Sequence, residues 1–184
     1  MITCIINILM LCLVGTTNLT RDDVQQGFQP QQEGDMQGVI KLAKYVSWPE
    51  EDNMMTTTII IAPQSDETFK TAENLAATSK ILSHGISVVR ITDCNDDALY
   101  NANIIFIESG ANIDIEKLIP KVADKQILTI TNDIKMLEKG CMFYVKYDHD
   151  TGHTSYYYNK EAILASPLSI SSHILMPDHK YEKK

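Results

Sequence analysis

The stretch TTTIIIA, from Thr56 to Ala62, decides the fold of this chain. Its residues are mostly β-branched and its apolar run is nearly continuous, which is typical of a strand buried on both faces. Three later stretches have the same character: 86–92 (ISVVRIT), 103–108 (NIIFIE) and 127–131 (ILTIT). Segments with helical periodicity separate these four, and strands that alternate with helices predict a parallel sheet with helices on both faces.

Apolar residues at helical spacing predict the intervening helices. The first helix should start at Met36 and end at Ser47-Trp48-Pro49, because the residue before a proline resists helical geometry. The remaining predicted helices span residues 65–82, 95–101 (short), 114–123, 136–139 (short) and 168–176.

Two alternating stretches near the C-terminus predict a β-hairpin. Residues 142–147 and 154–158 flank the turn sequence Asp150-Thr151-Gly152. The predicted fold class is therefore α/β, a mostly parallel sheet flanked by helices on both faces, with a C-terminal antiparallel hairpin.

The N-terminus predicts export. Residues 2–15 form an apolar run without charge, too short for a comfortable membrane helix of about 20 residues but suited to a signal peptide. An uncleaved anchor is the alternative. We expect a signal peptide at 1–18, a flexible glutamine-rich linker at 19–35, an α/β domain at 36–177 and a polar tail at 178–184.

The net charge limits the classes of partner, and the cysteine content limits the possible disulfides. The 184 residues carry a formal net charge of -8, which disfavours nucleic acid and anionic lipid as partners. Removal of the signal peptide would leave Cys94 and Cys141. These two residues form either one disulfide or two buried thiols, and the sequence leaves both open.

Sequence signatures of catalysis and cofactor binding are missing. The chain has no G-x-G-x-x-G, no P-loop, no G-x-S-x-G and no C-x-x-C sequence. His149 and His153 flank the predicted hairpin turn. We expect them to be solvated turn residues, and a weak metal site is the alternative. We therefore expect no catalytic residues, no cofactor and no metal.

Polar residues follow several predicted strands. In open α/β sheets, ligands bind beyond the carboxyl ends of the strands. The candidate ligand-binding residues are Gln64, Ser65, Ser109, Gly110, Asn132 and Asp133. Taken one by one, each is equally explained as a helix cap or a turn residue.

Tyrosines are concentrated on the predicted hairpin. Exposed tyrosines at a sheet edge are common in protein interfaces, although aromatic residues are also ordinary strand residues. Tyr144, Tyr156 and Tyr158 are the candidate partner-binding residues.

Several segments, in this order and spacing, resemble the YfiR-like family of periplasmic signalling proteins. The resemblance spans residues 36–176, and the segments are 41–49 (KLAKYVSWP), 59–62 (IIIA), 103–107 (NIIFI), 127–133 (ILTITND), 140–143 (GCMF), 157–162 (YYNKEA) and 168–175 (LSISSHIL). Relatives often carry a cysteine just before the third strand, where this chain has Asn101-Ala102-Asn103. The disulfides of some relatives are therefore not expected here.

The resemblance implies an α/β sandwich, periplasmic localisation, homodimers and no known catalysis. In the best understood relatives the protein restrains a membrane-bound diguanylate cyclase, and an outer-membrane-associated partner relieves that restraint. The leading hypothesis is a periplasmic regulator that binds a membrane signalling protein. The alternatives are a small-molecule binding module with its ligand at the strand ends, and a hydrolase that uses Asp93 or Asp133.

Overall fold

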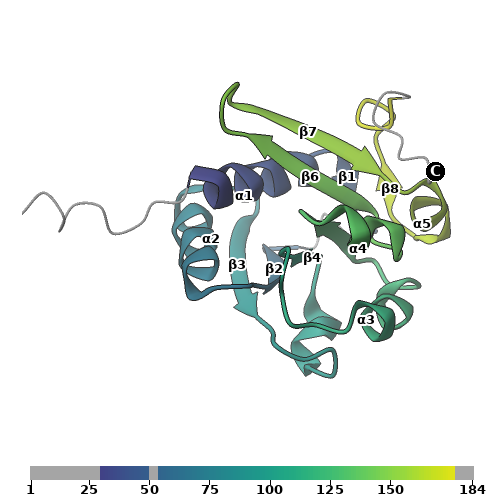
Figure 1. The fold of residues 1–184 in the computed structure, drawn as a ribbon. Coiled ribbons are helices and arrows are strands. Elements are labelled where there is room, and N and C mark those ends of the chain that lie inside the picture. Colours follow the sequence, from purple (N-terminus) through teal and green to yellow (C-terminus); the bar gives the residue numbers. More distant parts are fainter. Residues whose placement is uncertain (1–29, 50–53, 177–184) are drawn as a thin grey trace, which may run out of the picture.

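A computed structural model describes residues 30–49 and 54–176 of the chain. Six strands form one sheet in the order β3-β2-β4-β5-β6-β7, and two short strands, β1 and β8, form a separate pair (Figure 1). The strands are β1 (Val46–Ser47), β2 (Thr56–Ala62), β3 (Gly85–Arg90), β4 (Ile104–Ile107), β5 (Leu128–Thr131), β6 (Phe143–Asp148), β7 (His153–Tyr158) and β8 (Ser169–Ile170). The helices are α1 (Pro30–Ala43), α2 (Asp66–Thr78), the 3-10 helix η3 (Asp97–Asn101), α3 (Ile115–Val122), α4 (Ile134–Glu138) and α5 (Lys160–Ala165).

The predicted sheet is confirmed. Strands β3, β2, β4, β5 and β6 are parallel neighbours, and β7 closes the sheet as the antiparallel partner of β6. All residues of β4 and β5 are buried, because helices cover both faces of the central strands.

Alternate residues of the strands face two separate apolar clusters. On one face, Ile59 and Phe106 pack with residues of α1 and α2. On the other face, Ile60 and Ile105 pack with η3 and with Leu118 of α3. The side-chain period of two in each strand thus divides one sheet between two helical layers.

The first helix begins earlier than predicted. Helix α1 starts at Pro30, so residues 30–35 of the expected flexible linker are helical. These residues have few large apolar side chains, but Gly34 and Asp35 are buried against the hairpin, which supplies the missing stabilisation. The expected signal peptide, the rest of the linker and the whole polar tail lie outside the described residues.

The predicted final helix over 168–176 is wrong. Its place is taken by strand β8 and a turn, while the helix lies earlier, in α5, capped by the side chain of Asn159. Val46 of β1 pairs with Ile170 of β8. This pairing uses the backbone groups of β8, and tertiary pairing therefore overrides the apparent helical spacing of the segment.

Two glycines bring α1 close to the hairpin. A Cβ atom at Gly34 would overlap the ring of Tyr147, and one at Gly38 would lie 2.6 Å from Val145 Cγ2 and 2.8 Å from Thr154 Cγ2. The hydroxyl group of Tyr156 also donates a hydrogen bond to the Gly38 carbonyl oxygen, at 3.1 Å. The backbone of α1 therefore contacts side chains of the hairpin directly, at a distance that any residue larger than glycine would prevent.

Cys94 and Cys141 are buried free thiols, which decides between the two alternatives that the sequence left open for this pair. Cys94 and Cys141 belong to the same apolar cluster. Burial raises the pKa of the Cys141 thiol to about 12.

Candidate functional site

The carboxyl ends of β2, β4 and β5 meet at one edge of the sheet, and the predicted ligand-binding residues follow these ends (Figure 1). Gln64 and Ser65 follow β2, Ser109 and Gly110 follow β4, and Asn132 and Asp133 follow β5. The structure therefore brings these six residues to one edge, as parallel pairing requires.

A buried carboxylate ties the β2 and β4 ends together. Glu108 accepts a hydrogen bond from the Gln64 amide at 2.5 Å and one from Thr68 Oγ1 at 2.7 Å. Ser65 caps α2, because its hydroxyl accepts from the Thr68 amide at 3.3 Å. The side chain of Gln64 lies against Gly110, whose φ is +80°.

A second buried carboxylate joins α1 to the β5 end. Asp35 accepts from Asn132 Nδ2 at 2.9 Å, from the Tyr147 amide at 3.0 Å and from Gln31 Nε2 at 3.0 Å. Asn132 Oδ1 in turn accepts from the Ser109 amide at 2.6 Å. Burial raises the pKa of Asp35 above its ordinary value, although the three hydrogen bonds oppose the shift.

These contacts show what five of the six residues do in the folded chain. The side chains of Ser65 and Asp133 cap helices, that of Asn132 bridges two segments, and the Gln64 and Ser109 amides donate to neighbouring side chains. A ligand at this edge would have to replace such bonds, each of which contributes about 0.5–1.5 kcal/mol net. The predicted roles as helix caps (Ser65, Asp133) and turn residues (Ser109, Gly110) are confirmed, and ligand binding stays a prediction.

The three candidate tyrosines do not share a face of the hairpin. Tyr158 is 7% exposed, packs against Phe143 with ring centroids 6.4 Å apart, and donates to the Leu175 carbonyl oxygen. Tyr156 is half-buried, and its hydroxyl group donates a hydrogen bond to the Gly38 carbonyl oxygen. Both rings therefore face the α1 side, where Tyr158 is buried in the core and Tyr156 is partly covered by α1. Partner contact by these two residues stays a prediction.

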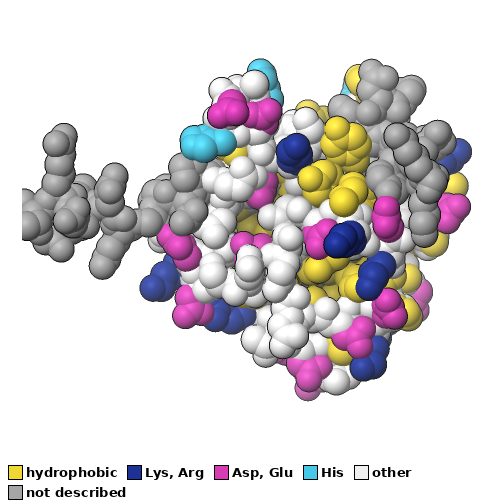
Figure 2. Space-filling model, in the orientation of Figure 1, with side chains coloured by type: hydrophobic (Ala, Val, Ile, Leu, Met, Phe, Trp, Pro, Cys, Tyr) yellow, Lys and Arg dark blue, Asp and Glu magenta, His cyan; other side chains and the backbone are white. Residues whose placement is uncertain are grey.

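Tyr144 lies on the other face, opposite Tyr157 in the register of β6 and β7. Their ring centroids are 5.8 Å apart with tilted planes, and Tyr157 is 36% exposed. We call Tyr144 and Tyr157 the tyrosine pair. Figure 2 shows hydrophobic side chains gathered on this side of the molecule, over the hairpin and α4.

Acidic groups border the tyrosine pair. The pKa of Tyr144 is raised by burial first, and then by the negative charges of Asp35 and Asp133. Exposed Ile134 begins α4, the helix that Asp133 caps and that contacts β6. The pair thus presents apolar ring surface together with hydroxyl groups, a combination suited to a protein interface.

Sequence reasoning missed Tyr157 and Asp35. The sequence does contain a signal for Tyr157. Asp148 pairs with His153 next to the turn, and counting back along both strands from this pair places Tyr144 opposite Tyr157. Asp35 had no such signal, since its place in the expected linker hid a contact with a strand more than 100 residues away.

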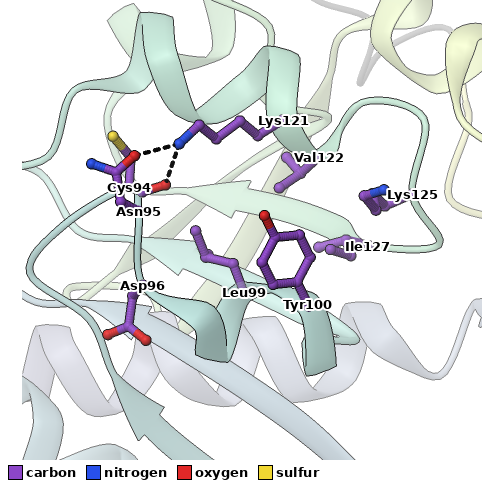
Figure 3. Close-up of a pocket in the computed structure, with 9 residues that line it drawn as sticks. All are labelled: Cys94, Asn95, Asp96, Leu99, Tyr100, Lys121, Val122, Lys125 and Ile127. Atoms are coloured by element: carbon purple, nitrogen blue, oxygen red, sulfur yellow. Dashed lines mark hydrogen bonds between the residues drawn. The ribbon is translucent and has the colours of Figure 1, made fainter.

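A small cavity of about 100 Å³ lies between η3 and α3 (Figure 3). Figure 3 shows Lys121 reaching across to the loop before η3, where its Nζ donates to the Cys94 carbonyl oxygen at 3.1 Å and to Asn95 Oδ1 at 2.6 Å. The ammonium group therefore fastens this loop to α3, and the thiol of Cys94 is buried beside it.

His149 and His153 are both exposed at the hairpin turn. Within residues 30–49 and 54–176, no group of three or more His, Cys, Asp or Glu side chains could hold a metal ion. The same described ranges contain no helix with the length and apolarity that crossing a membrane requires.

Comparison with protein families gives one finding. A family model described as YfiR/HmsC-like matches residues 34–176, which is more than half of the chain and agrees with the resemblance seen in the sequence. No curated protein matches the chain.

Proposed function

The chain belongs to the YfiR/HmsC-like family, and on this premise we propose that it is a periplasmic regulator of cyclic-di-GMP signalling. It binds the periplasmic part of a membrane-bound signalling protein, either a diguanylate cyclase or a similar sensor. The chain acts by contact and catalyses no reaction itself, and its homodimer is the further assembly that the family resemblance implies.

The observation that carries this proposal is the tyrosine pair. Tyr144 and Tyr157 lie on the face of the hairpin opposite α1, with Tyr157 exposed. Tyrosine is among the residues that contribute most to binding, because its ring buries a large area while its hydroxyl keeps a polar partner. The pair is also held by a rigid support, since β6 is bonded to both β5 and β7.

The alternative, a small-molecule binding module at the carboxyl edge, gains no support from the contacts there. Glu108 and Asn132 use their oxygens on the Gln64 and Ser109 amides. The same contacts hold the β2, β4 and β5 ends in place, so they also support the face that carries the tyrosine pair.

A photo-crosslinking residue in place of Tyr157 tests the proposal. In cells of the native host, we expect crosslinks between this position and a membrane sensor protein. The matched control is the same residue at Tyr100, which is 72% exposed in η3, away from the hairpin. Equal crosslinking from both positions, or no membrane protein captured from Tyr157, would contradict the proposal.

A second test measures signalling directly. Tyr157→Ala should raise cellular cyclic-di-GMP as deletion of the whole chain does, if the chain restrains a cyclase. If Tyr157 is one of the residues that dominate the interface, its loss costs more than about 1 kcal/mol, or roughly fivefold in affinity. Tyr100→Ala should leave the nucleotide level unchanged, and an unchanged level in Tyr157→Ala cells would show that the tyrosine pair is not the contact.

A further inference from the structure

Strand β7 forms one edge of the six-stranded sheet, and its outer side has no strand partner among the described residues (Figure 1). Along an antiparallel pair, backbone groups that bond the neighbouring strand alternate with groups that point away from it. The Asn159 amide donates to the Met142 carbonyl oxygen at 2.9 Å, so counting back along the register directs the Ser155 backbone groups toward β6. The N–H and C=O groups of Thr154 and Tyr156 therefore point to the open edge.

A groove of about 480 Å³ runs beside this edge. One wall includes Thr154 and Tyr156 of β7, and the other includes Lys41 in the last turn of α1 with Lys44 and Tyr45 just after the helix. An extended chain that pairs with the edge of β7 therefore lies next to both lysines.

The groove carries positive charge, although the whole chain has a formal net charge of -8. Lys41 and Lys44 are exposed, and the described residues that line the groove include no Asp or Glu. Neither lysine forms an ion pair within the described part of the chain. Asp148 and Asp150 of the hairpin are not part of the lining, and Asp148 lies on the face that carries the tyrosine pair. The charge of the groove thus favours an acidic occupant.

The spacing of the two lysines matches the spacing of alternate side chains on a strand. Lys44 follows the last residue of α1, and its amide donates to the Lys41 carbonyl oxygen at 3.2 Å, which continues the helical turn. Side chains three positions apart on such a turn have Cβ atoms about 5–6 Å apart, and alternate side chains of a strand are about 6.5 Å apart. A strand with acidic residues at every second position therefore sets two carboxylates beside two ammonium groups.

We infer that the open edge of β7 binds an extended acidic segment of a partner protein by strand addition. The backbone of the segment pairs with Thr154 and Tyr156, and its alternate carboxylates approach Lys41 and Lys44. A second copy of this chain suits the edge less well, because pairing two β7 strands would bring the lysines of both copies to one edge. The inference goes beyond the proposed function, since the tyrosine pair lies on the other face of the hairpin and contributes nothing to the groove lining.

Amide hydrogen exchange measured by NMR tests this inference, with the peptide acetyl-ETETET-amide as the probe. Chemical shifts give the Kd, and with peptide at ten times this Kd the Thr154 and Tyr156 amides should exchange about tenfold more slowly, because only the unbound chain exchanges. The Ser155 amide, which already faces β6, should keep its rate and serves as the internal control.

Charge variants test the role of the lysines. Lys44→Gln should weaken peptide binding about two- to fivefold, the effect of one exposed ion pair. Lys80→Gln is the matched control, because Lys80 is exposed between α2 and β3, at the opposite edge of the sheet, and this variant should bind as the parent chain does. Tyr157→Ala should also bind the peptide unchanged, so a failure of the proposed signalling contact is distinguishable from a failure of this inference.

Two altered peptides test strand addition without changing the fold of the chain. The block isomer acetyl-EEETTT-amide has the same charge and should bind more weakly, and methylation of the peptide nitrogens should weaken binding about two- to tenfold for each hydrogen bond lost. The inference is overturned if the edge amides keep their exchange rates, if the block isomer binds equally tightly, or if the methylated peptide binds unchanged. Protection of the edge amides that rises with chain concentration, without peptide, would assign the edge to a second copy and also overturn it.

Discussion

Replacing Gly38 by alanine should destabilise the fold, although alanine is the better helix former. Gly38 lies within α1, where a Gly-to-Ala change by itself stabilises a helix by about 0.5–1 kcal/mol. The new Cβ atom, however, would lie 2.6 Å from Val145 Cγ2 and 2.8 Å from Thr154 Cγ2. Both neighbours are β-branched strand residues with restricted χ1 angles, so neither can turn away easily.

The magnitude follows from these opposing effects. Overpacking of a well-packed contact costs typically about 1–3 kcal/mol, which exceeds the gain in helix propensity. We expect a net loss of about 1–2 kcal/mol in the free energy of unfolding. With a urea slope of about 2 kcal/mol/M, the midpoint should fall by about 0.5–1 M.

Urea unfolding followed by circular dichroism measures this loss, with Gly85→Ala as the control. A Cβ atom at Gly85 meets nothing within 4 Å, so that variant should unfold within about 0.5 kcal/mol of the parent chain. Val145→Ala combined with Gly38→Ala should cost less than the sum of the two single changes, because one clash is removed. A Gly38→Ala chain as stable as the parent would refute the close approach of α1 and the hairpin.

Three further predictions concern titratable groups. Burial raises the pKa of Asp35, so the contribution of this carboxyl group to stability is greatest below pH 3.8 and is lost as pH rises through the folded-state pKa. Urea midpoints measured across pH should show this fall in the parent chain and not in Asp35→Asn. The pKa of Cys141 is raised to about 12, so Ellman's reagent at pH 8 should label this thiol only as fast as the chain unfolds, and rapid labelling of the folded chain would contradict its burial. Burial raises the pKa of Tyr156 to about 12, so the free energy of unfolding should decline as pH rises above 10, and Tyr156→Phe should reduce that decline. At neutral pH the same variant should lose about 0.5–1.5 kcal/mol in urea unfolding, because it lacks the hydrogen bond to Gly38.

The parallel sheet could be predicted from sequence because its strands are buried on both faces. Runs such as Thr56–Ala62 are apolar without interruption, and only a doubly covered strand tolerates that pattern. The C-terminal segment misled the same reasoning, because its apolar residues fit a helix while pairing with Val46 made it a strand. A pairing between residues far apart in sequence leaves no local signal.

The candidate site was predictable to a similar extent. Residues at the strand ends could be placed on one edge, since parallel pairing alone brings them together. Whether Asn132 would meet a ligand or Asp35 could not be foreseen, because Asp35 comes from a helix at the other end of the chain. Predicting which tyrosines lie on which face of the hairpin requires the register of its two strands, which places Tyr144 opposite Tyr157.

The docking of α1 onto the hairpin has a consequence for how the chain folds during its synthesis. The helix emerges first, yet its apolar residues Met36, Val39 and Ile40 belong to a cluster completed by Phe143 and Tyr158. More than 100 residues must be made before this face is covered, and such distant contacts form slowly. The apolar side chains of this segment therefore stay uncovered until the hairpin has been made, and uncovered apolar surface of this kind favours aggregation of incompletely folded chains.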